Sequence, residues 1–104
     1  MQLQVTARHF EASPELRSYV ERRASKLGRY FDGINEINVV LERNGNGVPE
    51  KRAEMSLRVF RQTLSATDSA ISHEQAIDNC TERLRRQLMR YKAKLKSIER
   101  NVHR

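Results

Sequence analysis

With 104 residues the chain can build one domain around a single hydrophobic core, and it is too short for two. Twenty lysines and arginines against thirteen acidic residues give a net charge of +7, which favours a polyanionic partner, either nucleic acid or an anionic membrane. A single cysteine excludes an intrachain disulfide and a thiolate zinc site. Because no stretch of 18 apolar residues or N-terminal apolar segment occurs, we expect neither a membrane span nor a signal peptide, and a cytoplasmic location.

The chain is predicted to open with a strand followed by a helix. Residues 1–6 alternate apolar and polar side chains with a period of two, which is typical of a half-buried strand. Ser13 supplies a helix N-cap, and Pro14 suits the first helical position. One helical face then carries an apolar seam, which predicts a helix ending near residues 28–30. The seam consists of Leu16, Val20, Ala24, Leu27 and Phe31.

Three further strands are predicted in the middle of the chain. Residues 34–43 are rich in β-branched side chains, and residues 52–59 alternate strictly between apolar and polar. The turn-forming residues 44–49 lie between them, so a hairpin is expected. After a short connection at Arg61 and Gln62, residues 63–67 form a weaker fourth strand.

A long helix is predicted from Ser72 to Arg100. Ser72 followed by Gln75 has the form of a capping box. Apolar residues then repeat at spacings of three and four over about 40 Å of helix. They are Ile77, Cys80, Leu84, Leu88, Tyr91, Leu95 and Ile98. The order β-α-β-β-β-α predicts an α+β domain, residues 1–104, with two helices on one face of a four-stranded sheet and a short tail from about residue 97.

Basic side chains gather on one flank of each predicted helix, at 100° per residue. The second helix carries, on one flank and its crown, Arg83, Arg86, Gln87, Arg90 and Lys94. The first helix carries, on one flank, Tyr19, Arg22, Arg23, Lys26, Arg29 and Tyr30. Neither flank includes a carboxylate from its own helix. Helices that are merely soluble usually interleave both signs, so this asymmetry favours a polyanion-binding surface. Tyrosines among the cations can stack on unpaired bases, although Tyr30 and Tyr91, at the seam edge, are more simply interpreted as core.

The sequence offers little for catalysis. His9, His73 and His103 lack metal-ligand spacing and are interpreted as surface residues. Cys80 falls inside the apolar seam and is expected to be a small core side chain, because no histidine shares its helical neighbourhood. The glycines at 45 and 47 are explained by the hairpin turn. We therefore expect no enzyme activity, cofactor, metal or small-molecule substrate.

Taken together, these segments resemble the ribosome hibernation-promoting factor family, also described as ribosome-associated inhibitors or subunit-interface proteins. The similarity covers essentially the whole chain, including residues 16–20 and 26–34 around the first helix. In the second helix it includes residues 76–78 and 84–88 and the basic ladder that follows, formed by Arg90, Lys92, Lys94 and Lys96. The order and separation of these pieces carry the resemblance.

The resemblance implies a fold similar to double-stranded-RNA-binding domains and a cytoplasmic role in silencing translation in idle, stressed or stationary-phase cells. Such proteins occupy the messenger and transfer RNA channel of the small ribosomal subunit and contact ribosomal RNA. Carried over by position, the RNA-binding candidates are Arg22, Arg23, Lys26, Arg29, Arg83, Arg86, Gln87, Arg90, Lys92 and Lys94.

Two departures from the family pattern leave questions open. Family members often have Asp and Tyr where this chain has Ser72 and Glu74, and Glu74 would repel phosphate. The chain ends at Arg104 without the extra C-terminal domain of long members, so we expect no ribosome dimerisation through such a domain. The short tail could favour ribosome dimers together with a helper factor or could block them, and the sequence leaves both alternatives open. The alternative to RNA binding is a basic amphipathic interaction or membrane-surface module, with the helical seam buried in lipid.

Overall fold

The computed structural model describes residues 1–43 and 51–102. Side chains are described for residues 1–43 and 51–97. The predicted turn at residues 44–49 and His103 lie outside the described residues. The element order is the predicted β-α-β-β-β-α. The elements are β1 (Gln2–Arg8), α1 (Pro14–Ser25), the 3₁₀ turn η1 (Lys26–Arg29), β2 (Glu36–Arg43), β3 (Lys51–Val59), β4 (Gln62–Ala70) and α2 (His73–Val102).

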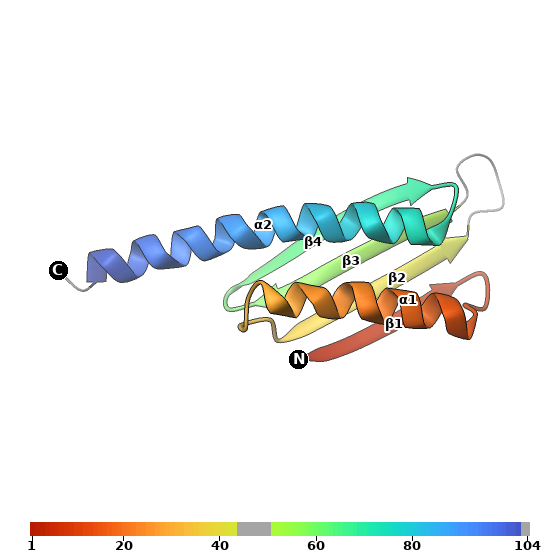
Figure 1. Ribbon diagram of the computed structural model, residues 1–104, viewed down its shortest axis with the longest axis horizontal. Coiled ribbons are helices and arrows are strands. Elements are labelled where there is room, and N and C mark those ends of the chain that lie inside the picture. The colour runs from red at the N-terminus through yellow and green to blue at the C-terminus, as the bar shows by residue number, and fades with distance from the viewer. Residues whose placement is uncertain (44–50, 103–104) are drawn as a thin grey trace.

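The four strands form one mixed sheet in the order β1-β2-β3-β4. β1 runs parallel to β2, and the other two pairings are antiparallel. Both helices lie on the same face of the sheet, with α1 near β1 and β2 and α2 along β3 and β4 (Figure 1). The predicted two-layer architecture is therefore confirmed, while the likeness to double-stranded-RNA-binding domains stays a prediction.

The core lies between the sheet and the two helical seams. Ile37, Leu41 and Leu57 of the sheet meet Val20 of α1 and Leu84 of α2, and all five are fully buried. β1 is less covered, since its inward side chains are only half buried. The predicted seam of α2 is buried from Ile77 to Tyr91 and Leu95 is half buried, whereas its last member, Ile98, lies outside the described side chains. These contacts fix the orientation of both helices and of the flanks they expose.

The N-terminal ends of α1 and α2 are capped by the predicted serines, but only half of the predicted capping box forms on α2. Ser13 Oγ accepts a hydrogen bond from the Leu16 amide at 3.1 Å, and Ser72 Oγ accepts one from the Gln75 amide at 3.1 Å. The reciprocal half of the second capping box is absent, because the Gln75 side chain donates to Asn79 instead. Ser72 therefore fulfils its predicted role as a cap.

His73 contradicts its interpretation as a surface residue. It is 5% exposed, its ring stacks on Phe10 with centroids 4.7 Å apart, and its Nε2 lies 3.1 Å from the Glu42 carbonyl oxygen. The loop carrying Phe10 folds back over the first turn of α2, a tertiary contact that helical spacing does not reveal. His9 is exposed, as expected.

The molecule is elongated, with principal dimensions of 56 × 24 × 18 Å. The C-terminal part of α2 extends past the sheet at the end where β3 turns into β4 (Figure 1). Thirty helical residues at about 1.5 Å each outrun the nine residues of β4 beneath them. The basic residues Arg90, Lys92, Lys94 and Lys96 lie where α2 leaves the sheet and this overhang begins, with Leu95 still packed against the edge of the core.

Candidate nucleic-acid interface

The positive charge of the protein is concentrated in its helical layer. The two helices and η1 together contain thirteen lysines and arginines against six acidic residues, whereas the four strands contain five against four. Because both helices cover the same face of the sheet, one side of the molecule is strongly basic. A basic face of this kind raises the local concentration of a polyanion and accelerates its association.

The opposite face of the sheet is close to neutral. Glu36 is paired in register with Arg58, and Glu42 with Arg52, so opposite charges lie directly across from each other on neighbouring strands. Their side chains alternate with the buried residues that face the helices. The exposed face of the sheet should therefore attract a polyanion more weakly than the helical layer does.

On the first helix, three of the four predicted basic residues lie at the surface. Arg22, Lys26 and Arg29 are exposed and line an open hollow on the outer side of α1 and η1. Arg23 differs, because its Nε lies 2.8 Å from Asp78 Oδ1 of α2, without the alignment of a hydrogen bond. The predicted carboxylate-free flank therefore meets carboxylates from both helices, because Glu21 of α1 lines the same hollow and Asp78 of α2 pairs with Arg23.

Asp78 also ties Tyr19 to α2. The Tyr19 hydroxyl donates a hydrogen bond of 2.6 Å to Asp78 Oδ1, and this bond to an anion, followed by burial, raises the pKa of Tyr19. Tyr19 is therefore occupied in holding α1 against α2 and does not present its hydroxyl to solvent. Its predicted role in base stacking is limited by this contact.

On α2, the predicted basic flank divides into an engaged half and an exposed half. Arg83 donates to the Thr67 carbonyl oxygen at 2.7 Å and to Asp68 Oδ1 at 3.1 Å, and Gln87 donates to the Ser65 carbonyl oxygen at 2.9 Å. These acceptors belong to β4, an edge strand of the sheet. Arg90 and Lys94 are exposed, and neither forms an ion pair with a carboxylate of the described residues.

Arg86 and Lys92 lie on the remaining surface of α2. Arg86 is exposed, and its Nε is 3.5 Å from Glu82 Oε1. Lys92 is half buried. Such exposed ion pairs contribute little to stability, so Arg86 can exchange Glu82 for another anion at small cost.

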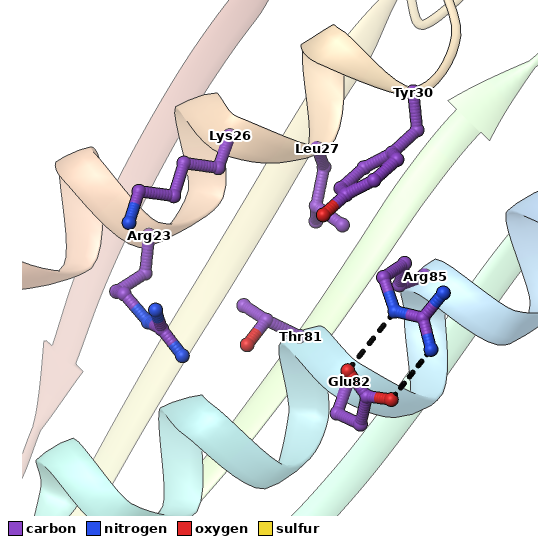
Figure 2. A pocket seen from close by; sticks show the side chains of 7 residues that line it. All are labelled: Arg23, Lys26, Leu27, Tyr30, Thr81, Glu82 and Arg85. Carbon is purple, nitrogen blue, oxygen red and sulfur yellow. Dashed lines mark hydrogen bonds and ion pairs between the residues drawn. The ribbon is translucent and has the colours of Figure 1, made fainter.

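A groove separates the two helices, and on the α2 side it is lined by Thr81, Glu82 and Arg85, none of which was among the predicted RNA-binding residues. It has a volume of about 170 Å³, and Figure 2 shows Tyr30 and Leu27 projecting toward Thr81 and Arg85 of α2. Tyr30 is 39% exposed, so its interpretation as core is wrong, whereas Tyr91 is buried as expected. Arg85 forms two hydrogen bonds to Glu82, of 3.0 and 2.7 Å, which lower the pKa of the Glu82 carboxyl.

The described residues provide no metal site and no activated nucleophile. No group of three His, Cys, Asp or Glu side chains within them is arranged to hold a metal ion. Cys80 is fully buried, and desolvation, with a smaller contribution from Asp68, raises the pKa of its thiol to about 11. The expectation that it is a core side chain is confirmed. None of the described helices is long and apolar enough to cross a membrane.

The sequence and the β-α-β-β-β-α fold are both similar to those of known proteins. The family model described as Sigma 54 modulation protein / S30EA ribosomal protein matches residues 3–96. The chain belongs to this family. It is 34% identical over 99 residues to the ribosome hibernation promoting factor of Escherichia coli (strain K12), covering 92% of this chain and 98% of that relative. The resemblance inferred from the sequence is thereby confirmed.

Two solved structures have the same fold. The N-terminal domain of Thermus thermophilus Protein Y superposes with a TM-score of 0.75 at 27% identity, covering 88% of this chain and 99% of that domain. A ribosomal subunit interface protein from Coxiella burnetii superposes with a TM-score of 0.77 at 25% identity, covering 89% and 99%. This family fold places both basic flanks on one side of the sheet.

Proposed function

We propose that this protein is a cytoplasmic ribosome hibernation factor without enzymatic activity. It binds the small ribosomal subunit in the channel for messenger and transfer RNA, contacts ribosomal RNA through its helical layer, and silences translation by excluding both RNAs. The observation that carries the proposal is the charge asymmetry between the basic helical layer and the neutral sheet face, in a member of a family whose relatives are named for ribosome hibernation.

The contacts within the protein rank the ten candidate residues. Arg22, Lys26, Arg29, Arg90 and Lys94 are exposed and make no ion pair among the described residues, so they can approach phosphates directly. Arg86 can exchange Glu82 for a phosphate at small cost, and Lys92 is half buried, so both rank below these five. The remaining three, Arg23, Arg83 and Gln87, act mainly by fixing the helices to each other and to β4.

Burial of the helical seam disfavours the membrane-surface alternative. An amphipathic helix binds lipid by inserting its apolar face, but Ile77, Leu84 and Leu88 are fully buried against the sheet. Lipid binding would require α2 to leave the core, exposing most of the apolar side chains that hold the domain together. RNA binding requires no such rearrangement.

Co-sedimentation with small ribosomal subunits across a salt series tests the proposal. If six basic side chains each replace a counterion of a phosphate, affinity falls about a thousandfold between about 50 and 200 mM salt. Absence of co-sedimentation at low salt would overturn the proposal. An in vitro translation assay on the same preparation should show inhibition that weakens over the same salt range.

A pair of matched double variants separates the helical layer from net charge. The variant Arg90→Gln with Lys94→Gln should bind subunits at least tenfold more weakly. The control variant Arg52→Gln with Arg58→Gln removes the same two charges from the exposed sheet face and should bind normally. Equal losses in the two variants would show that binding follows net charge and is not localised to the helices.

A helper factor for ribosome dimerisation is a further proposed partner, tested by adding it to this assay.

A further inference from the structure

The turn between β3 and β4 displays two side chains in a costly arrangement. Phe60 is 68% exposed, and Arg61 has a backbone φ of 63°, in the left-handed region where a residue with a side chain is disfavoured. The Arg61 guanidinium carbon lies 5.1 Å from the centre of the Phe60 ring, within the range of a cation–π contact. Glycine would relieve the backbone strain at this position, so an arginine there points to a role for its side chain.

The same turn lies against the root of the α2 overhang. The Tyr91 hydroxyl donates a 2.9 Å hydrogen bond to the Phe60 carbonyl oxygen, which fixes the turn to the helix. Beside this contact is an open hollow of about 180 Å³, located between the start of β4 and α2. It is lined by Gln62, Leu64, Gln87, Arg90, Tyr91 and Lys94.

The lining chemistry of this hollow suits an anion bearing an aromatic group. Arg90 and Lys94 place two exposed cations on one side, without an ion pair to any described carboxylate. Gln62 and Gln87 add amide groups. The hollow is smaller than the roughly 300 Å³ at which small-molecule pockets begin, so a free metabolite would stay largely in solvent. A phosphate is small enough to enter a hollow of this size, whereas a base attached to it would remain outside.

We propose that the hollow and the β3–β4 turn together hold one unpaired nucleotide of the bound RNA. Its phosphate contacts Arg90 and Lys94, and its base stacks on the exposed pair formed by Phe60 and Arg61. The inference rests on the proposed function, since it specifies how that RNA is held. It predicts a preference for a single-stranded or bulged segment at this end of the molecule, because a base inside a duplex cannot reach an aromatic ring.

A protein partner is the competing explanation for an exposed phenylalanine. The arrangement favours RNA, because Tyr91, which is bonded to the Phe60 carbonyl oxygen, lines the hollow together with Arg90 and Lys94, and protein interfaces are depleted in lysine. An RNA segment neutralises all three cations with its own phosphates and offers a π-face to the ring. The two partners are distinguished by substitutions that separate stacking from apolar contact.

Subunit binding should be measured for wild-type protein, Phe60→Leu and the control Ile71→Ser. Leucine keeps an apolar side chain and removes the aromatic face, so Phe60→Leu should weaken binding about tenfold, the typical loss of one stacked base. Ile71 is 85% exposed at the β4–α2 junction, and replacing it should leave binding unchanged. The slope of affinity against salt should stay at the wild-type value in Phe60→Leu, because no charge is removed.

Arg61→Gly separates a binding role from a structural one. Removal of the strained side chain should raise the thermal midpoint or leave it unchanged, while subunit binding weakens several-fold. A lower midpoint with normal binding would show that Arg61 serves the fold and would overturn the inference. Ultraviolet crosslinking of the wild-type complex provides a direct measurement, and a ribosomal RNA nucleotide should be attached at or beside Phe60.

The outcomes keep this inference separate from the proposed function. If wild-type protein binds subunits but Phe60→Leu and Arg61→Gly bind equally well, the nucleotide site is wrong and the hibernation proposal stands. A crosslink from Phe60 to a ribosomal protein also overturns the nucleotide site. If wild-type protein fails to bind subunits at low salt, the proposed function itself fails, and with it the basis for the site.

Discussion

Two arginines two helical turns apart on the same flank of α2 should behave oppositely when neutralised. Arg83 holds the edge strand β4 through the Thr67 carbonyl and Asp68, whereas Arg90 is exposed and unpaired among the described residues. Arg83→Gln should therefore destabilise the fold. Each lost hydrogen bond contributes about 0.5 to 1.5 kcal/mol, and the Arg83 side chain is 52% exposed, so solvent screening reduces the total to about 1 kcal/mol.

For a domain of this size, about 1 kcal/mol lowers the thermal midpoint by roughly 4 to 8 °C. Arg90→Gln should leave the midpoint unchanged, because surface substitutions without partners usually alter stability by less than about 0.5 kcal/mol. In subunit binding we expect the opposite, with a larger effect for Arg90→Gln than for Arg83→Gln. Arg90→Gln should reduce the slope of log affinity against log salt by about 0.7 to 0.9, the contribution of one phosphate contact, while Arg83→Gln leaves the slope unchanged.

Both variants are measured by the same two assays, thermal unfolding followed by circular dichroism and co-sedimentation across a salt series. A reduction of the salt slope by Arg83→Gln as large as that by Arg90→Gln would refute the assignment of Arg83 to the fold. Such a result would mean that Arg83 leaves β4 to meet RNA, and that its contacts in the isolated protein do not predict its role in the complex.

Three further predictions concern the fold. Leu84→Ala should cost about 2 to 5 kcal/mol in urea unfolding, because the side chain is fully buried, and a loss below 1 kcal/mol would contradict the assigned core. Tyr19→Phe should lower stability by about 1 kcal/mol through loss of the hydrogen bond to Asp78, with subunit binding unchanged at low salt; weaker binding would give Tyr19 a direct role. The raised pKa of Cys80, about 11 in place of 9.0, stabilises the fold below pH 9, and this contribution is lost between pH 9 and 11 as the thiol ionises in the unfolded chain. Cys80→Ala should therefore show a flatter pH dependence of stability in that window, and an identical dependence would contradict burial of the thiol.

The fold could be predicted because its signals are local. Apolar spacing identified the strands and the seams of both helices, and the spacing of Ser72 and Gln75 identified a helix cap. The structure confirms the strands, the cap and the seams over the side chains that it describes. β4 extends to Ala70, beyond the predicted Thr67, because its last residues pair with the start of β3 and not because of their own strand propensity.

The site could be predicted only to the level of a helical flank. A helical wheel places Arg23 and Arg83 beside exposed cations, but it contains no information about Asp78 on the other helix or Asp68 on β4. His73 was misassigned for the same reason, because Phe10 covers it from a distant loop. Phe60 and Arg61 gave no signal at all, since their position beside α2 depends on the hydrogen bond from Tyr91.

The contacts that α2 makes with β4 also bear on aggregation. An edge strand with unsatisfied backbone groups is a template onto which another chain can add, and proteins usually block it with charge or cover. Here Arg83 and Gln87 occupy the carbonyl oxygens of Thr67 and Ser65, so a strand arriving at this edge must displace a cation and an amide before it can pair. At high protein concentration this edge is therefore protected from intermolecular sheet growth. Arg83→Gln should thus increase the tendency of the protein to aggregate as well as lower its melting temperature.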